Sequence, residues 1–285
     1  MSEPRAQTTC YRHPDRATGL RCSECDRPIC VECSIDAAVG QRCPTCVQRE
    51  GAQRTVNVRT QWASAARRGA PVTSAIIGVT VAIHVIGFLS PALYQELFSW
   101  FVMSNFLARA GELWRLLTVI LLHASLTHIL FNMWALYNLG PQIEREVGTA
   151  RFLALYLSTA AVGSAFAFHL GAQNSALGSP GDLAVGASGA IFGLFGVWMA
   201  SAVRRRHTRV GRAILNQLGF LLVINAAIPF FVPRVSWQAH LGGLAAGFLI
   251  GWVWAAVKGP NAPRIHLAFA TALGVLAVLS VPVLG

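Results

Sequence analysis

Polar residue types that cooperate in nucleophilic catalysis occur within strongly apolar stretches of this chain. Ser188 lies in "VGASGAIFG", His240 lies in "SWQAHLGGLAAG", and "THILFN" holds two more polar groups, His128 and Asn132. A serine hydroxyl becomes a nucleophile when a neighbouring base, usually histidine, takes its proton. The tetrahedral oxyanion then needs donors, and His128, Asn132 and the Ser188 amide are suitable. Since no Asp or Glu lies inside the apolar segments, the sequence favours a Ser188–His240 dyad over a triad and excludes an intramembrane aspartyl protease.

Simpler interpretations of these residues stay open at this point. A serine between small neighbours is common packing material in membrane helices, and an intramembrane histidine is often a satisfied structural group. Three histidines could also bind a metal or haem. On one continuous helix, His128 and Asn132 share a face, whereas His123 lies about 140° away from His128, which argues against a chelating pair.

The composition predicts a small polar head followed by a polytopic membrane domain. Of 285 residues, 54% are hydrophobic and 12% are charged, against roughly 25% charged in soluble domains. The last acidic residue is Asp182, and the net charge of +11 comes from basic groups that mostly flank apolar runs. This distribution is typical of membrane proteins and argues against a nucleic-acid partner.

Seven apolar segments are candidates for spanning helices, which need about 20 residues each. Arg67 and Arg68 precede the first segment, and more basic residues follow the second, fourth and sixth, so the positive-inside rule predicts a cytosolic N-terminus. No cleavable signal peptide is expected, because the N-terminus is polar and Cys-rich. The predicted segments are Val72–Leu89, Leu113–Leu139, Phe152–Leu170, Ser188–Val203, Ala213–Val232, Trp237–Val257 and Ile265–Leu284.

This topology places the polar groups together. The second, fourth and sixth segments all run from outside to inside, so His128, Ser188 and His240 are expected at one depth in the outer leaflet. Glycines recur every four residues in the fourth and sixth segments, which predicts close packing of these two helices. The glycines concerned are Gly189, Gly193, Gly243, Gly247 and Gly251.

The N-terminal head predicts zinc binding. All seven cysteines lie between Cys10 and Cys46. With one histidine they form four pairs, called knuckles below, in which two other residues separate the two ligands. Zinc prefers four such ligands in a tetrahedron, so the head suits two ions. A disulfide domain is the alternative, which the odd cysteine count and a cytosolic location disfavour. The knuckles are Cys10–His13, Cys22–Cys25, Cys30–Cys33 and Cys43–Cys46.

The membrane part resembles the rhomboid intramembrane serine proteases over roughly residues 113–251. The motifs that carry this resemblance are Trp114–Arg115, His123-x4-His128-x3-Asn132, Glu144–Arg145, Gly186–Ala187–Ser188–Gly189 and Ala239–His240-x-x-Gly243.

The resemblance implies a fold and residue roles. The expected fold is all-α, with a six-helix rhomboid-like bundle, a seventh C-terminal helix and a preceding zinc domain. Ser188 is then the nucleophile, His240 the general base and acid, and His128, Asn132 and the Ser188 amide the oxyanion hole. No cofactor is expected in that site. Supporting roles fall to His123 (structure or water), Gly186 (backbone near the serine), Phe192 (stacking on His240) and Trp114 with Arg115 (outer loop).

The head resembles a B-box-type zinc finger. That resemblance implies one ion on Cys10, His13, Cys30 and Cys33, and a second on Cys22, Cys25, Cys43 and Cys46. The expected domains are 1–48 (cytosolic zinc domain), 49–70 (linker), 71–258 (catalytic membrane domain) and 259–285 (seventh helix). An interaction or regulatory role, with a protein partner, is expected for the head.

The overall expectation is an endopeptidase of the bacterial plasma membrane whose site opens to the outside and which cleaves single-span membrane proteins. Two alternatives are an inactive rhomboid-like binding protein and a seven-helix receptor or transporter. The first class usually lacks the serine or histidine. The second needs a continuous polar pathway, whereas the inner halves of these segments are nearly all apolar.

Overall fold

The computed structural model describes residues 8–36, 40–49, 69–171, 183–231 and 236–282. The chain divides into two compact units, Met1–Arg68 and Gly69–Gly285. Most of the predicted linker lies outside the described residues, as do Trp62, Arg67 and Arg68, on which the predicted orientation partly rests.

The N-terminal unit is built around its cysteines. Its regular elements are short: η1 (Val31–Cys33), β1 (Ile35–Asp36) and β2 (Gln41–Arg42), which pairs antiparallel with β1, followed by helical residues 44–49. The buried core consists of Ile29 and six of the cysteines, with Cys25 and Tyr11 packed against it. Such a small apolar core is typical of domains that depend on metal or disulfide cross-links.

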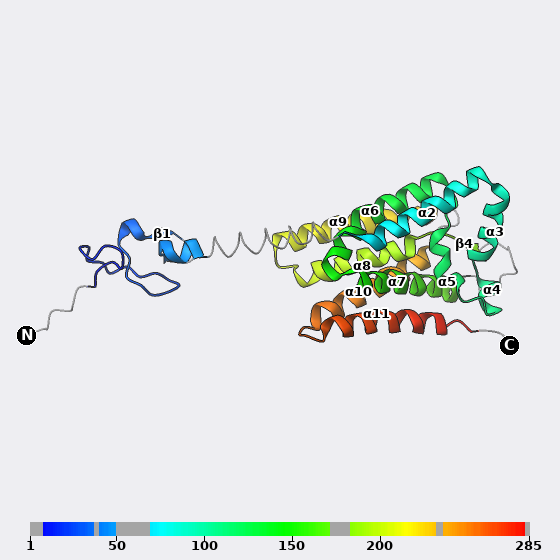
Figure 1. Cartoon of the computed structure of the whole chain (residues 1–285). Helices are drawn as coiled ribbons and strands as arrows, with labels where there is room; N and C mark the ends of the chain where they lie inside the picture. The colour runs from blue at the N-terminus through cyan, green and yellow to red at the C-terminus, as the bar shows by residue number, and fades with distance from the viewer. Residues whose placement is uncertain (1–7, 37–39, 50–68, 172–182, 232–235, 283–285) are drawn as a thin grey trace, which may run out of the picture. The chain divides into compact units, whose positions relative to one another are not determined.

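The C-terminal unit is a bundle of apolar helices (Figure 1). Among the described residues, four helices are long and apolar enough to cross a membrane, and a fifth span results if a bent pair is counted as one. Short elements gather at one end of the bundle, where β3 pairs antiparallel with β4. The elements are α2 (Pro71–Leu89), α3 (Pro91–Phe101), β3 (Met103–Ser104), α4 (Asn105–Arg109), α5 (Arg115–Thr118), η2 (Val119–Leu121), α6 (Leu126–Val147), α7 (Thr149–Leu170), β4 (Leu183–Ala184), α8 (Ser188–Arg204), α9 (Arg209–Phe231), α10 (Trp237–Ala256) and α11 (Ala262–Leu279).

The second predicted segment differs from its expected form. It is broken after Leu121, and the stretch Arg115–Leu121 is bent by 97° from α6. Ser125 caps the N-terminus of α6 by accepting a hydrogen bond from the His128 amide at 3.2 Å. Hydropathy alone could not show this break, because the residues on both sides of it are apolar.

The predicted glycine contact between the fourth and sixth segments is confirmed. Helix α10 packs against α8 more extensively than against any other element. A Cβ atom added at Gly243 would collide with the carbonyl oxygen of Gly189, and one added at Gly247 would collide with that of Gly193. The two backbones therefore touch, which brings the start of α8 beside the start of α10.

Helix α11 is tied to the core rather than loosely appended. It packs on α7, where the Ser158 hydroxyl donates to the Ala270 carbonyl at 2.6 Å. Gly274 lies against the same serine, and the Trp254 indole of α10 donates to the His266 carbonyl at 3.1 Å.

Candidate active site

The Ser188 hydroxyl and the His240 imidazole are in contact. The distance from Ser188 Oγ to His240 Nε2 is 2.8 Å, within the roughly 3.5 Å expected of a nucleophile and its base. Both side chains are half-buried. The pair therefore combines a direct hydrogen bond with partial access to the surface.

The backbone before Ser188 creates room for a reacting group. Helix α8 begins at Ser188, and no side chain caps its N-terminus, so the first N–H groups have no intrahelical acceptor. Gly186 has φ +125°, which L side chains rarely adopt, and a Cβ there would lie 2.8 Å from the His128 ring and 3.8 Å from Ser188 Oγ. Only glycine leaves the space between these two side chains open.

His128 and Asn132 lie on α6, one turn apart. The Asn132 side-chain amide donates to the His128 carbonyl at 2.9 Å and is buried, whereas the His128 ring is half-buried. The His128 ring and Ser188 Oγ both border the space that the missing Cβ of Gly186 leaves open. The start of α8 and the His128 ring thus lie around one small space, and Asn132 follows His128 by one turn of α6.

His123 does not lie on the helix that carries His128, so the rotation of about 140° does not describe it. It lies in the break before α6, with its ring edge-on to the His128 ring at a centroid distance of 4.9 Å. It is 3% exposed, and neither ring nitrogen has a hydrogen-bond partner among the described residues. Buried polar groups of this kind are commonly satisfied by water.

Phe192 lies where the stacking aromatic is expected. Its ring is parallel to the His240 imidazole, with an interplanar angle of 5° and a centroid distance of 4.2 Å. Its position one turn after Ser188 on α8 places it on the same helix face as the serine. The stack restrains the imidazole plane without a carboxylate partner.

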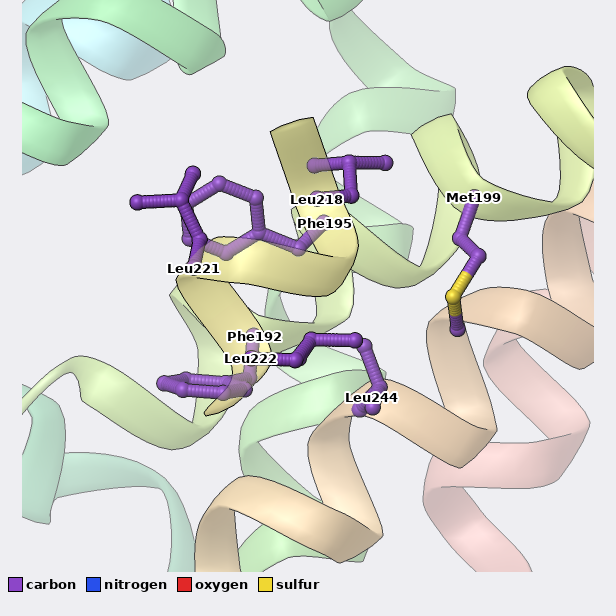
Figure 2. A pocket seen from close by; sticks show the side chains of 7 residues that line it. All are labelled: Phe192, Phe195, Met199, Leu218, Leu221, Leu222 and Leu244. Carbon is purple, nitrogen blue, oxygen red and sulfur yellow. The ribbon is translucent and has the colours of Figure 1, made fainter. Parts of the chain in front are cut away.

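Phe192 also borders an apolar pocket between α8, α9 and α10 (Figure 2). The other lining residues are Phe195 and Met199 of α8, Leu218, Leu221 and Leu222 of α9, and Leu244 of α10. One side chain thus contacts both the dyad histidine and the α8–α9 interface.

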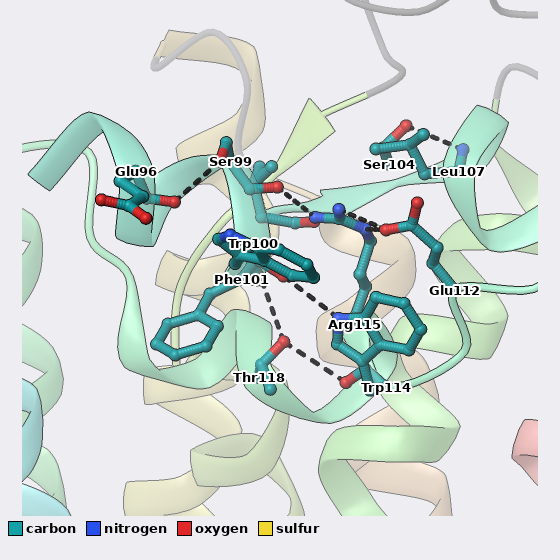
Figure 3. A network of polar contacts seen from close by, with 11 residues as sticks. Glu96, Ser99, Trp100, Phe101, Ser104, Leu107, Glu112, Trp114, Arg115 and Thr118 are labelled. Atoms are coloured by element: carbon teal, nitrogen blue, oxygen red, sulfur yellow. Dashed lines mark hydrogen bonds and ion pairs between the residues drawn. The ribbon is translucent and has the colours of Figure 1, made fainter.

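Trp114 and Arg115 stabilise the short elements at this end of the bundle (Figure 3). The Arg115 side chain is 3% exposed, and its Nη1 donates to the carbonyls of Ser99 at 2.7 Å and Val102 at 3.0 Å. Its Nε donates to Glu112 at 2.8 Å. The Trp114 indole donates to the Trp100 carbonyl at 3.2 Å. Arginine suits this position because its planar fork reaches several acceptors at once.

Glu144 has a structural role that its sequence motif did not indicate. The carboxylate is 1% exposed and accepts from the amides of Val72 at 3.0 Å and Thr73 at 2.9 Å, and from the Thr73 hydroxyl at 2.7 Å. It therefore caps α2, whose own N-cap residue is Ala70. The sequence signal for this role was the absence of a capping residue before α2, which requires an acceptor from elsewhere in the chain. Glu144 lies within α6, near its end at Val147, so the segment ends later than the predicted Leu139.

Two further residues on α7 position the dyad helices. The Thr159 side chain occupies the space that Gly193 of α8 leaves open, and Gly163 allows the Ala239 carbonyl of α10 to approach. Thr159 and Gly163 lie within the predicted segment Phe152–Leu170, where spacing alone does not identify the helix that each of them contacts.

The N-terminal unit brings the eight predicted ligands into two groups. The ligand atoms within each group lie within 4.8 Å of one another, and the first group places the Cys30 and Cys33 sulfurs 3.4 and 3.5 Å from His13 Nδ1. The first and third Cys/His pairs form one group and the second and fourth the other, as the resemblance to a B-box-type zinc finger implies. The groups are Cys10, His13, Cys30, Cys33 and Cys22, Cys25, Cys43, Cys46.

Each group contains a thiol that favours its ionised form. Burial by itself raises the pKa of Cys10 and Cys22, but hydrogen bonds from backbone amides outweigh it and lower both pKa values to about 6. Thiolate sulfur and imidazole nitrogen are the donors that zinc prefers. The residues present therefore fit a tetrahedral metal ion in each group.

Comparisons with known proteins agree with the membrane fold. The rhomboid domain family matches residues 110–257. The chain is 38% identical to YdcA of Bacillus subtilis over 144 residues, which are 50% of this chain and 68% of that protein. It is 34% identical to the rhomboid protease GluP of Bacillus subtilis over 186 residues, 64% of this chain and 35% of GluP. It is also 38% identical to RHOMBOID-like protein 1 of Arabidopsis thaliana over 144 residues, 50% of this chain and 35% of that protein.

The matched region contains Ser188, His240, the α6 side chains and the segment with Trp114 and Arg115, while the Cys-rich unit lies outside it. Together with its apolar helices, this match identifies an integral membrane protein. The chain belongs to the rhomboid family of intramembrane serine proteases.

Proposed function

We propose that this protein cleaves peptide bonds in or near the membrane-spanning segments of single-span membrane proteins, with Ser188 as nucleophile and His240 as general base and acid. The observation that carries the proposal is the 2.8 Å contact between Ser188 Oγ and His240 Nε2 at the first residue of α8. The chain spans 68% of YdcA but only 35% of GluP, so the activity of this whole protein is inferred from its own residues.

The chemistry follows from the positions of the two side chains. His240 Nε2 accepts the hydroxyl proton while Ser188 Oγ bonds to the scissile carbonyl carbon. His240 then gives that proton to the leaving amine as the C–N bond breaks, leaving an acyl ester on Ser188. A water molecule, deprotonated by His240, then attacks the ester carbon. His240 returns this proton to Ser188 Oγ as the ester C–O bond breaks, which releases the acid product and regenerates the hydroxyl.

The negative oxygen of the tetrahedral intermediates needs donors already in place. The Ser188 N–H has no intrahelical acceptor, the His128 ring borders the space beside Gly186, and Asn132 lies one turn after His128 on α6. Removing one such donor typically lowers kcat by about 10²–10³-fold. His128→Ala and Asn132→Ala are therefore expected to lower kcat far more than they change KM.

The remaining supporting residues act through structure. Phe192 restrains the His240 ring, Gly186 keeps the oxyanion space open, His123 holds water beside His128, and Trp114 with Arg115 braces the outer loop. Because a helical backbone hides its carbonyls, preferred substrates have helix-destabilising residues near the cut and a small residue just before it.

A reconstitution experiment tests the proposal. Purified protein in liposomes with a tagged single-span substrate should cleave it, whereas Ser188→Ala and His240→Ala should not. Ser201→Ala is the matched control, since Ser201 lies on the same helix, far from the dyad, and should retain activity. A fluorophosphonate probe should label wild type at Ser188 only. Cleavage by Ser188→Ala at the wild-type rate contradicts the mechanism.

The proposal extends to topology. The N-terminus lies in the cytosol of a bacterial cell, and the site opens to the outer side of the plasma membrane. Single cysteines are introduced near Thr127 and near Arg205 and treated with a membrane-impermeant thiol reagent. The cysteine near Thr127 should react in intact cells, and the one near Arg205 only after permeabilisation. The reverse pattern contradicts this orientation.

The N-terminal unit is proposed to hold two zinc ions in the groups given above, as a cytosolic module of residues 1–48 that binds a protein partner. Residues 49–70 are the linker, 71–258 the catalytic domain and 259–285 the seventh helix. Metal analysis of the full chain should find about two zinc ions. Substitution of Cys43 by Ser should remove one of them, and an unchanged zinc content contradicts the ligand assignment.

A further inference from the structure

The turn between α8 and α9 concentrates positive charge without neutralising partners. Taken with the adjoining ends of α8 and α9, it contains Arg204, Arg205, Arg206, Arg209 and Arg212, and all five are exposed. No carboxylate follows Asp182 in the sequence, and none of the ion pairs in the described parts of the chain involves these arginines. Such a cluster attracts an anion from outside the protein.

Hydrogen bonds keep this turn compact. The Thr208 amide and hydroxyl both donate to the Arg205 carbonyl, at 2.9 and 2.8 Å, and the Gly211 amide donates to the Thr208 hydroxyl at 3.0 Å. Gly211 packs so closely on Arg205 that a Cβ there would collide with its carbonyl. Arg212 closes the turn by donating to the His207 carbonyl at 3.1 Å. The arginines are thus confined to one short segment despite their mutual repulsion.

The turn lies where a membrane surface is expected. It follows the end of α8 that is distant from Ser188, and the Arg204 guanidinium lies 5.2 Å above the Trp252 ring of α10. Tryptophan paired with arginine at a helix end is typical of the headgroup level of a bilayer. This position does not depend on which side of the membrane the turn occupies.

The exposed face of α9 changes character along its length. Arg209 and Arg212 are followed, at the spacing of one helix face, by Phe220 and Val223, which are 67% and 70% exposed. At a rise of about 1.5 Å per residue, the apolar pair lies on the order of 12 Å beyond Arg212. A phospholipid matches this arrangement, because its charged phosphate is followed, over a similar distance, by a hydrocarbon chain.

We propose that the α8–α9 turn binds an anionic glycerophospholipid. Its phosphate contacts Arg205, Arg209 and Arg212, and one acyl chain lies along Phe220 and Val223. The N-terminal unit is a poorer occupant, because its arginines outnumber its acids by eleven to seven. Its carboxylates on Glu32, Asp26 and Glu24 already pair with arginines. The bound lipid anchors the turn that joins the serine helix to α9.

The test measures lipid retention by the full, metal-loaded chain carrying Ser188→Ala, so that proteolysis plays no part. The protein is placed in nanodiscs of phosphatidylcholine with a small fraction of phosphatidylglycerol, and native mass spectrometry gives the apparent affinity for phosphatidylglycerol. Arg205→Gln/Arg209→Gln/Arg212→Gln should weaken it on the order of 100-fold.

A charge-matched control uses Arg151→Gln/Lys258→Gln/Arg264→Gln, which removes three charges at the starts of α7 and α11 and the end of α10. This variant should change the affinity by no more than a few-fold. An equal loss in both triple variants overturns the proposal, since it shows general attraction to the membrane. Tryptophan fluorescence during thermal unfolding verifies that both variants are folded.

Two further measurements separate a phospholipid from a soluble anion. Phe220→Ala/Val223→Ala should weaken retention of the diacyl lipid while leaving the arginines intact, and unchanged retention contradicts the acyl contact. Inorganic phosphate at millimolar concentration should not displace the lipid. Displacement at that concentration overturns the proposal in favour of a free-anion site.

Discussion

At the scale of single residues, the space above Ser188 depends on Gly186. Gly186→Ala would place a Cβ 2.8 Å from the His128 ring at a backbone φ of +125°, so both steric and conformational strain arise. We expect kcat to fall at least on the order of 100-fold, as for loss of an oxyanion donor. The measurement is steady-state cleavage of a reconstituted substrate.

Gly78→Ala is the matched control for this prediction. Gly78 lies in α2, and a Cβ there meets nothing within 4 Å. Since alanine favours the helix by about 0.5–1 kcal/mol over glycine, this variant should be at least as stable as wild type and fully active. Wild-type kcat in Gly186→Ala would show that the His128 ring can move away without cost.

At the scale of elements, the dyad depends on contact between two helix backbones. Gly247→Leu would force a side chain against the carbonyl of Gly193, and backbone cannot retreat as a side chain does. We expect a loss of stability of about 3 kcal/mol or more, seen as a lower thermal unfolding midpoint, together with loss of probe labelling at Ser188. Gly219→Leu, at an open position on α9, should leave both measurements unchanged.

Helix α11 connects indirectly to the dyad through α7. Ser158 holds α11 through the Ala270 carbonyl, and the next residue, Thr159, fills the space beside Gly193 of α8. Ser158→Ala removes one buried hydrogen bond and should cost about 1 kcal/mol, because the Ala270 carbonyl lies within α11 and keeps its helical backbone donor. Gly274→Leu should cost more, since its side chain meets the Ser158 backbone at 2.9 Å.

Differential scanning fluorimetry in detergent measures both of these effects. Ala272→Leu, at an exposed position on the same helix, is the control and should unfold at the wild-type temperature. If Gly274→Leu also unfolds at that temperature, α11 is not held against α7 as described.

At the scale of the whole molecule, two compact units carry separate spectroscopic probes. All seven cysteines lie between Cys10 and Cys46, whereas seven of the eight tryptophans lie in the C-terminal unit and only Trp62 precedes it. Removing zinc with a chelator should therefore expose seven reactive thiols, while the tryptophan unfolding transition of the membrane unit stays within a few degrees. A structural zinc site contributes folding free energy directly, which is why its loss should unfold the head.

The outcome that contradicts this prediction is equally measurable. If the thiols remain protected after complete chelation, the head folds without metal and the ligand assignment is wrong. If the tryptophan transition falls together with the thiol protection, the two units are energetically coupled.

Several features could be predicted from residue types alone, for a physical reason in each case. Long apolar runs define spans because an unsatisfied backbone in lipid is too costly, and the glycine spacing of Gly243 and Gly247 defines a helix contact because only small residues allow it. Knuckles such as Cys22–Cys25 predict metal binding from local spacing. The contact between Ser188 and His240 also followed, since both lie at the same end of helices that share a glycine interface.

Other features exist only in the folded chain. The break before α6 moves His123 off the helix, and it forms where Ser125 caps a new start rather than where hydropathy falls. Glu144 lies 71 residues from Thr73, and no local pattern relates that carboxylate to the amide which it caps. The sequence by itself determined the membrane class, the ligand knuckles and the candidate dyad, because these depend on composition and short spacing. Tertiary structure decided the bent span, the α7 contacts and the site geometry, because each depends on where distant backbone atoms meet.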